Sequence, residues 1–174
     1  MIKVTKKKRK NPDSQDTIKF IRENSINFHK IGQGGEGIVF YFKLNKSLVV
    51  DVEILKPGEY TFKLFRNNSG ERPLRRSKIL KIYSKYGLIP KIYLINNNYS
   101  ISDYIHGHSL NYVYEHFPKS IPNINYKLDK LRKIWYKLGF EHGDMTSDNI
   151  LISENLKSVY LIDPYIEYNS PTLD

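Results

Sequence analysis

The sequence predicts an α+β protein with two lobes, a β-rich first lobe with one helix and a much smaller second lobe. Between residues 26 and 65, short β-branched and aromatic runs alternate with turn residues at Asn45-Lys46 and Pro57-Gly58, as in antiparallel strands. Apolar residues recur at helical spacing between 125 and 138, and Gly139 follows them. Two apolar runs near the end predict a hairpin. Strands in the first half and a helix in the second favour two lobes.

The expected elements follow from local patterns. Apolar residues at 18, 20 and 21 predict a short helix or docking strap over 17–23. Strands are expected from Ile26 onward and over 38–44, 48–55 and 60–65, close enough in the chain to form a meander. A basic amphipathic helix is expected over 73–86, because its apolar residues share one face and Gly87 stops it. The remaining expected elements are strands 91–95 and 99–105, helix 125–138 and a hairpin of 150–152 with 159–162.

Length and composition exclude several classes of protein. A chain of 174 residues suffices for one compact domain, and without cysteine it has neither disulfides nor thiolate metal ligands. No apolar run approaches the roughly 18 residues that span a bilayer. The polar stretch 11–16 follows the basic N-terminus where a signal peptide would be apolar, so no signal peptide is expected. These features predict a cytoplasmic protein that does not associate with membranes.

The net charge of +10 is concentrated at the N-terminus. Residues 1–10 hold six of the 28 basic residues and no acid, which leaves 22 bases against 18 acids in the remainder. The tail is interpreted either as a nuclear-import or nucleic-acid-binding arm, or as a disordered solubilising end. We therefore divide the chain into a basic, disordered tail (1–16), a first lobe (17–103) and a minimal second lobe (104–174).

A glycine string, GQGGEGIV, occupies residues 32–39. Glycines let a backbone approach phosphates closely, although such a string is also compatible with a plain hairpin turn. In a dinucleotide-binding fold a helix follows the glycines, whereas here a strand is expected. The order indicates a phosphate-covering loop formed by Gly32, Gly34, Gly35, Gly37 and Val39.

A second string, HGDMTSDN, runs from His142 to Asn149, between the expected helix and hairpin. An aspartate at position 144 is placed to accept the proton of an incoming hydroxyl, and Asn149 to bind Mg²⁺. Taken alone, both residue types are also common in turns and caps. His142 is interpreted as a packing residue, and the other four histidines as structural.

Asp163 ends the hairpin strand that returns toward Asn149. Because a hairpin brings its two ends together, the Asp163 carboxylate is expected beside Asn149. Two oxygen ligands together with phosphates and water form an ordinary Mg²⁺ site.

The three elements together resemble the protein-kinase-like superfamily, and the resemblance runs from about residue 31 to Asp163. The HGD form resembles aminoglycoside phosphotransferases and the small atypical kinase of the tRNA-threonylcarbamoylation complex. The short chain is similar to the minimal effector kinases that bacterial pathogens inject into host cells. The resemblance implies ATP and Mg²⁺ as cofactors, a protein substrate such as a eukaryotic host protein, and a location in the host cytosol or nucleus.

The superfamily also has a lysine on the third strand that contacts the phosphates. Lys63 lies within an expected strand, while Lys56 fits the usual distance from the glycines but abuts a turn, so Lys63 is favoured. The stretch 102–107 resembles the linker between lobes, where the backbone at Asp103 and Ile105 would bind adenine; it is also compatible with a plain linker.

The sequence departs from this pattern in four places. Helix 73–86 has no acid to pair with the lysine, and Glu71 is the nearest acid. Pro164 and Tyr165 follow Asp163 where phenylalanine and glycine are usual, and Gly143 replaces an arginine. Only 11 residues follow Asp163, which leaves no room for an activation segment. Constitutive activity and activation by a partner protein both remain open.

The functional hypotheses are therefore three. The leading one is a Ser/Thr protein kinase with Asp144 and Lys63 as catalytic residues and Asn149 and Asp163 as metal ligands. The alternatives are a non-catalytic nucleotide-binding module and a small-molecule phosphotransferase.

Overall fold

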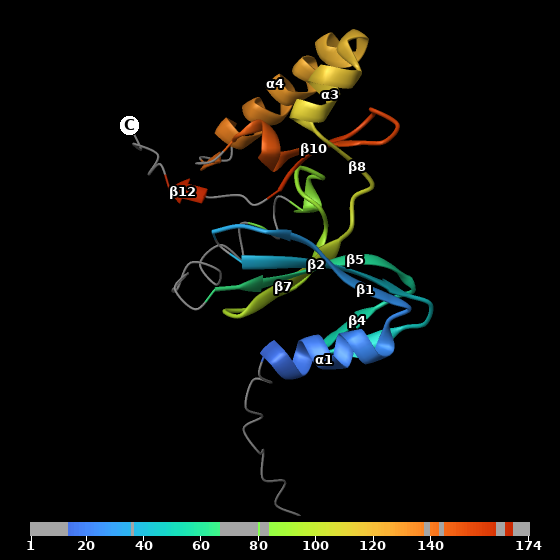
Figure 1. Ribbon diagram of the computed structural model, residues 1–174. Coiled ribbons are helices and arrows are strands. Elements are labelled where there is room, and N and C mark those ends of the chain that lie inside the picture. The colour runs from blue at the N-terminus through green and yellow to red at the C-terminus, as the bar shows by residue number, and fades with distance from the viewer. Residues whose placement is uncertain are drawn as a thin grey trace, which may run out of the picture.

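The computed structural model has two parts, and residues 104–106 form one of the segments that connect them (Figure 1). It describes residues 14–35, 37–66, 80, 84–137, 140–142, 145–162 and 166–168. A five-stranded sheet forms the first part, with helix α1 on one side of it. Helices α3 and α4 lie in the second part, on the other side of the sheet (Figure 1). The described chain is thus an α+β protein with three helices, compatible with two small lobes.

The first part is built on an antiparallel sheet with the strand order β1-β2-β5-β7-β6. Alternating apolar residues predict half-buried strands of this kind, because one face of each strand packs on a core and the other does not. The strands are β1 (Asn27–Gln33), β2 (Gly37–Leu44), β5 (Gly58–Phe65), β6 (Ile92–Ile95) and β7 (Tyr99–Asp103).

The outer face of the sheet carries the first hydrophobic core. Phe42, Phe62 and Ile101 point to this face and are fully buried, and Ile18 and Ile21 of α1 (Ser14–Asn24) are buried against them. The short ribbon of β3 (Leu48–Val50) and β4 (Glu53–Leu55) contributes Leu48, Val50 and Leu55 to the same core. The side chains that alternate with these core residues along β2 and β5 therefore face the second part.

The second part contains the other core, between a small sheet and two helices. Its three-stranded sheet has the order β11-β10-β8, with β8 (Gly107–Ser109), β10 (Ile150–Ser153) and β11 (Val159–Leu161). Helix α3 (Leu110–His116), a 3₁₀ turn over Pro118–Ser120 and α4 (Ile121–Lys137) cover this sheet. Val113, Ile124 and Ile152 are fully buried between them. A separate ribbon pairs β9 (Phe140–His142) with β12 (Ile166–Tyr168).

Several predicted elements are confirmed. The strands expected from Ile26 and over 38–44, 60–65 and 91–95 are present within one or two residues, as is the hairpin 150–162. The segment 17–23 is a helix that starts at Ser14, so the end of the predicted tail at residue 16 is wrong by at least three residues. Helix 125–138 begins four residues earlier than predicted, after the turn that contains Pro118.

The prediction of one strand over 48–55 is wrong. Asp51 adopts a left-handed conformation with φ 53°, and the chain reverses there to form the β3–β4 ribbon. The hydroxyl of Tyr99 donates to the Asp51 carboxylate at 2.7 Å, which ties this turn to the sheet. As a result β2 pairs directly with β5, and the expected three-strand meander does not form. The strand predicted over 99–105 ends at Asp103.

Candidate active site

The glycine string lies where the first two strands of the sheet meet. Strands β1 and β2 pair as a hairpin in which Gly32 is opposite Val39, and the Gly34 N–H donates to the Gly37 carbonyl at 2.9 Å. An irregularity in the pairing between Lys30 and Gly32 bends the strand just before the glycines. The predicted order of strand, glycine loop and strand is therefore what the structure has.

Different physical causes explain why glycine occupies these positions of the hairpin. A Cβ at Gly37 would lie 2.1 Å from the Leu64 carbonyl oxygen, so the close approach of β2 to β5 requires glycine. In the described part of the chain, a Cβ at Gly34 or Gly35 would have no heavy atom within 4 Å. Packing therefore explains Gly37, while the loop at Gly34 and Gly35 leaves open space beside the backbone.

Lys63 lies next to this hairpin. It is the cross-strand partner of Val39 on β2 and of Ser100 on β7, so it occupies the middle of the sheet. It alternates with the core residue Phe62 and thus points to the face turned toward the second part. Its Nζ lies 5.9 Å from the centroid of the Phe65 ring.

Lys56, the alternative lysine, lies at the opposite end of the strand pair. It precedes β5, whose first residue Gly58 pairs with Leu44 at the far end of β2. Seven residues separate Leu44 from Gly37, about 23 Å along a strand. The exposed Lys56 is therefore remote from the glycine loop, and the structure brings only Lys63 beside it.

The linker that leads from β7 into β8 comprises residues 104–106. The Asp103 N–H donates to the Lys91 carbonyl at 2.9 Å, and the Tyr104 N–H donates to the Glu59 carbonyl at 3.1 Å. The Asp103 carboxylate accepts a hydrogen bond from the Tyr93 hydroxyl at 2.8 Å. Ile105, predicted to bind adenine through its backbone, makes no backbone hydrogen bond to another described residue, so its N–H is available to a ligand.

Glu59 on β5 connects the sheet to this linker, a role that the sequence analysis missed. Its carboxylate accepts hydrogen bonds from Lys43 Nζ at 2.9 Å and from the Tyr41 hydroxyl at 3.0 Å, and it contacts the His106 ring. The hydrogen bonds from Lys43 and His106 lower the pKa of Glu59 to about 2. Burial and the hydrogen bond to this carboxylate raise the pKa of Tyr41. The alternation of Glu59 with Tyr60 is the signal that predicts its face, but nothing local predicts these partners.

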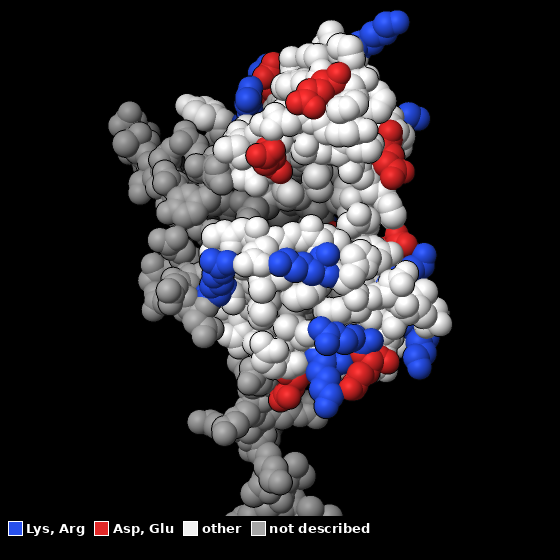
Figure 2. Space-filling model, in the orientation of Figure 1, with Lys and Arg blue, Asp and Glu red and all other residues white. Residues whose placement is uncertain are grey.

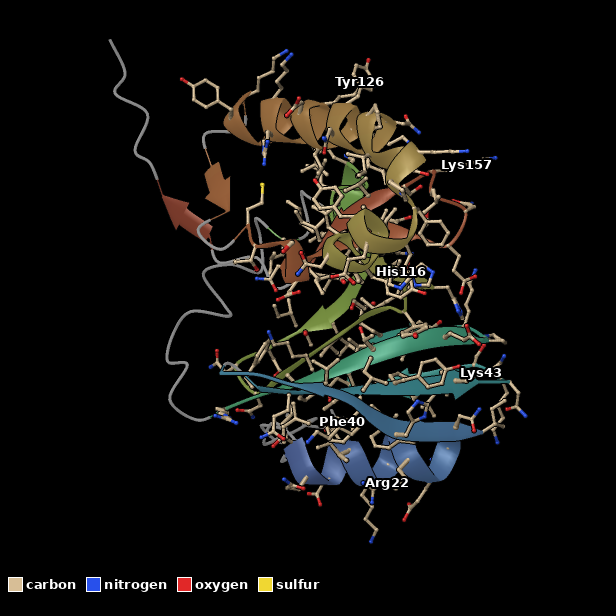
Figure 3. The ribbon with its side chains drawn as sticks, turned by 45° about the horizontal axis from the view of Figure 1, so that its top comes forward. Arg22, Phe40, Lys43, His116, Tyr126 and Lys157 are labelled. Atoms are coloured by element: carbon tan, nitrogen blue, oxygen red, sulfur yellow. The ribbon has the colours of Figure 1, made fainter. Side chains whose placement is uncertain are left out.

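Aromatic rings continue this contact across the linker. The Tyr104 ring stands edge-on to the rings of Tyr41 and His106, with centroids 4.8 and 4.9 Å apart. On α3, Tyr112 stacks between His108 and His116 with centroid distances of 4.5 and 4.0 Å. Figure 3 shows His116 on the side of α3 that faces the sheet. These histidines stack against aromatic rings near the junction of the two parts.

The second motif lies at the start of β10. Ser147–Asn149 forms a 3₁₀ turn, in which the Asn149 N–H donates to the Thr146 carbonyl at 3.0 Å. The Asn149 carbonyl accepts from the N–H of Ile162 at 2.8 Å. The hairpin therefore returns the chain to Asn149 one residue before Asp163, as the sequence analysis expected.

Two side chains hold this turn in place. Asn111 of α3 donates to the Asp148 carboxylate at 2.9 Å, and the Arg132 guanidinium of α4 lies 3.5 Å from the Met145 sulfur. Neither contact was predicted: α3 was not expected at all, and nothing local pairs Arg132 of α4 with Met145. Both helices thus contribute to the position of the segment 145–149.

The two ends of the HGDMTSDN motif are held by backbone pairing. His142, its first residue, pairs with Ile166 between β9 and β12, and the carbonyl of Asn149, its last residue, accepts the N–H of Ile162. Asp144 and Asp163 themselves lie outside the described residues, as do Gly143, Glu71 and most of the predicted helix 73–86. Of that helix, Leu80, Ser84 and Lys85 are described and helical.

The space-filling view is hollowed between the sheet and the second part (Figure 2). Lys63 and Glu59 of β5 belong to the face of the sheet that borders this hollow, and Tyr104 of the linker contacts Tyr41 on the same face. Among the described residues, no group of three or more His, Asp or Glu side chains is gathered as metal ligands would be. None of the described helices has the length and apolar content that crossing a bilayer requires.

Comparison with known proteins assigns no family to this chain, so the functional proposal rests on the geometry of the site. A scan against protein-family models finds no match, and no curated protein matches the sequence.

Proposed function

We propose that the protein is a protein-kinase-like phosphotransferase that transfers the γ-phosphate of ATP to a Ser/Thr hydroxyl of a protein. The observation that carries the proposal is the register of Lys63 with Val39, beside the glycine hairpin. The bond between Ile162 and Asn149, which joins the ends of the two other motifs, supports it independently. A glycine loop, an adjacent strand lysine, and Asp and Asn beside each other are the parts that phosphoryl transfer requires.

The described residues fit a bound nucleotide. The open space beside Gly34 and Gly35 leaves room for phosphates, and glycine at these two positions has no packing reason in the described part of the chain. Lys63 would contact the phosphates, the backbone at Asp103 and Ile105 would bind adenine, and Asn149 and Asp163 would hold Mg²⁺. The metal ion would neutralise the charge of the phosphates during transfer.

The protein's own residues supply positioning and one proton acceptor. Asp144 orients the acceptor hydroxyl and takes its proton, which typically accelerates such reactions by about 10²–10⁴. Lys63 contributes a positive charge where negative charge shifts toward the leaving phosphate. The linker fixes the sheet relative to the second part through Glu59 and His106, and this keeps the two halves of the site in register.

The absence of an acid in residues 73–86 favours the alternative of a non-catalytic nucleotide-binding module. Both proposals require the protein to bind ATP, but only the kinase transfers phosphate from it. Purified full-length protein incubated with labelled ATP, Mg²⁺ and a eukaryotic cell lysate is expected to label a protein in the lysate. Binding of ATP without any transfer would support the non-catalytic module, and labelling of a small metabolite alone would support a small-molecule phosphotransferase.

A further inference from the structure

Helix α4 is the most basic element of the described chain. Its 17 residues include five basic side chains and one acid. The acid, Asp129, is bridged by Arg132 at 3.3 Å. Lys127 donates to the carbonyls of Leu156 and Lys157 at 3.2 and 2.6 Å, which caps the neighbouring turn. Three lysines remain on this helix, and their roles are not explained by these contacts.

These lysines are Lys130, Lys133 and Lys137. All three are exposed, and none forms an ion pair with an acid in the described part of the chain. Together with Tyr126 they are spaced by four, three and four residues, so they follow one line along the helix. The line is about 17 Å long at 1.5 Å per residue. It lies opposite the buried residues Ile124, Leu128 and Leu131.

Two tyrosines accompany the lysines. Tyr126 is 68% exposed and Tyr136 is 82% exposed, and Figure 3 shows Tyr126 on the outer side of α4. A cation in the last helical turn, such as Lys137, is explained by its interaction with the helix dipole. That interaction does not explain Lys130, and it does not explain why two large rings stay in water when aromatic residues usually bury most of their surface.

A row of unpaired cations attracts a polyanion, and exposed rings beside the cations favour one that has planar bases. Bases of single strands stack on aromatic side chains, while their phosphates follow a positively charged surface. Duplex bases are already stacked on one another, so the tyrosines would add nothing to duplex binding.

We propose that the outward face of α4, formed by Tyr126, Lys130, Lys133, Tyr136 and Lys137, binds single-stranded nucleic acid. The lysines contact successive phosphates, and the tyrosines stack on bases at the two ends of the row. Helix α4 lies in the second part, apart from the sheet that carries Lys63 (Figure 1), so the proposal does not depend on phosphotransferase activity.

The test measures binding of the full-length protein to a fluorescent oligouridine by anisotropy over a range of salt concentrations. Three phosphate contacts predict a contribution of about −2 to the slope of log K against log salt. The double variant Lys130→Ala, Lys133→Ala is expected to bind at least about tenfold more weakly and to lose about 1.4 units of that slope. The double variant Tyr126→Ala, Tyr136→Ala is expected to bind at least about fivefold more weakly with an unchanged slope.

Matched controls are available elsewhere in the chain. The double variant Lys19→Ala, Lys46→Ala removes two exposed lysines from the first part, and Tyr86→Ala removes an exposed tyrosine outside α4. Each is expected to bind as the wild type does, and thermal unfolding checks that every variant is folded.

Three results would overturn the proposal. Wild-type affinity in the tyrosine variant would show that only charge matters. Equal binding of duplex DNA or polyglutamate would indicate a general anion site or an acidic protein partner. Binding that is lost on deletion of residues 1–10 and unaffected by the α4 variants would assign it to the basic tail.

Discussion

The N–H of Ile162 donates to the carbonyl of Asn149 at 2.8 Å. These residues are 13 positions apart, at the two ends of the β10–β11 hairpin. One belongs to the HGDxxxxN motif, and the other immediately precedes Asp163. The bond therefore brings the ends of the two motifs together in space, because the antiparallel strands of the hairpin return the chain to its starting point.

The predicted carboxylates are tested by Asp144→Ala and Asp163→Ala. Asp144→Ala is expected to lower turnover by at least about a hundredfold while leaving ATP binding largely intact, since it removes only the proton acceptor. Asp163→Ala is expected to weaken Mg²⁺-dependent ATP binding as well. Labelled-ATP transfer and calorimetric binding measure the two effects, with the exposed Asp16→Ala as control. Wild-type turnover in Asp144→Ala would contradict the catalytic assignment.

The choice between the two lysines is tested by a matched pair. Lys63→Ala is expected to lower kcat/KM for ATP at least tenfold, about 1.4 kcal/mol of transition-state stabilisation. Lys56→Ala is expected to be near neutral, because Lys56 lies at the other end of β5 from the glycine loop. The reverse ranking would mean that the nucleotide does not lie beside Val39.

The glycines of the hairpin are expected to separate into structural and ligand-binding positions. Gly37→Ala places a Cβ against the Leu64 carbonyl and is expected to lower the free energy of unfolding by about 1–3 kcal/mol. A Cβ at position 34 meets open space, so Gly34→Val is expected to change stability little and to raise KM for ATP. Chemical denaturation and steady-state kinetics measure the two outcomes. An unchanged KM in Gly34→Val would argue against phosphates at this loop.

The Glu59 cluster predicts a dependence of stability on acid pH. The pKa of Glu59 is lowered to about 2 in the folded protein, from about 4.3 in an unfolded chain. A depressed carboxyl pKa stabilises the fold above the unfolded value, and this stabilisation is lost as the pH falls from about 4.3 toward 2. Glu59→Gln is therefore expected to be less stable than the wild type at pH near 6, and the difference is expected to shrink below about pH 4.

Thermal unfolding at a series of pH values measures this difference. Glu23→Gln, an exposed glutamate of α1, serves as the control. A difference between Glu59→Gln and the wild type that stays constant down to the lowest pH would show that the contacts with Lys43 and His106 do not depend on the Glu59 charge.

The docking of α1 on the sheet is tested by two neighbouring residues. Ile21 is fully buried in the first core, whereas Phe20 is 43% exposed. Ile21→Ala is expected to lower the free energy of unfolding by about 2–5 kcal/mol, because it leaves a cavity beneath the sheet. Phe20→Ala is expected to cost less than about 1 kcal/mol. Similar losses in both variants, measured by urea denaturation, would mean that α1 does not pack as described.

Local patterns predicted most strands of the described chain and the long helix α4, and they gave the segment of α1 as a short helix or a docking strap. In β5 the alternation of Tyr60, Phe62 and Leu64 with polar residues identifies the strand and its buried face before any partner is known. The same pattern favoured Lys63 over Lys56, because Lys63 lies within the strand and Lys56 lies next to a turn. Hairpin closure likewise placed the chain before Asp163 next to Asn149, because the two strands are adjacent in the sequence.

Pairings between distant segments were not predictable in this way. Residues 48–55 have the composition of a strand, yet Asp51 reverses the chain and Tyr99, 48 positions away, holds that turn. Glu59 gains its partners only when β2, β5 and the linker come together. Helix α3 is short and has little apolar periodicity of its own.

The amino-acid sequence by itself therefore determined the faces of the strands, the glycine loop and the order of the motifs, since these depend on residues a few positions apart. The tertiary structure alone decided that β5 pairs with β2, that Glu59 joins the sheet to the linker, and that Asn111 holds the turn before Asn149. Contacts of this second kind form because burying two apolar cores brings remote segments together. Their free energy depends on the whole packed chain and not on any local pattern.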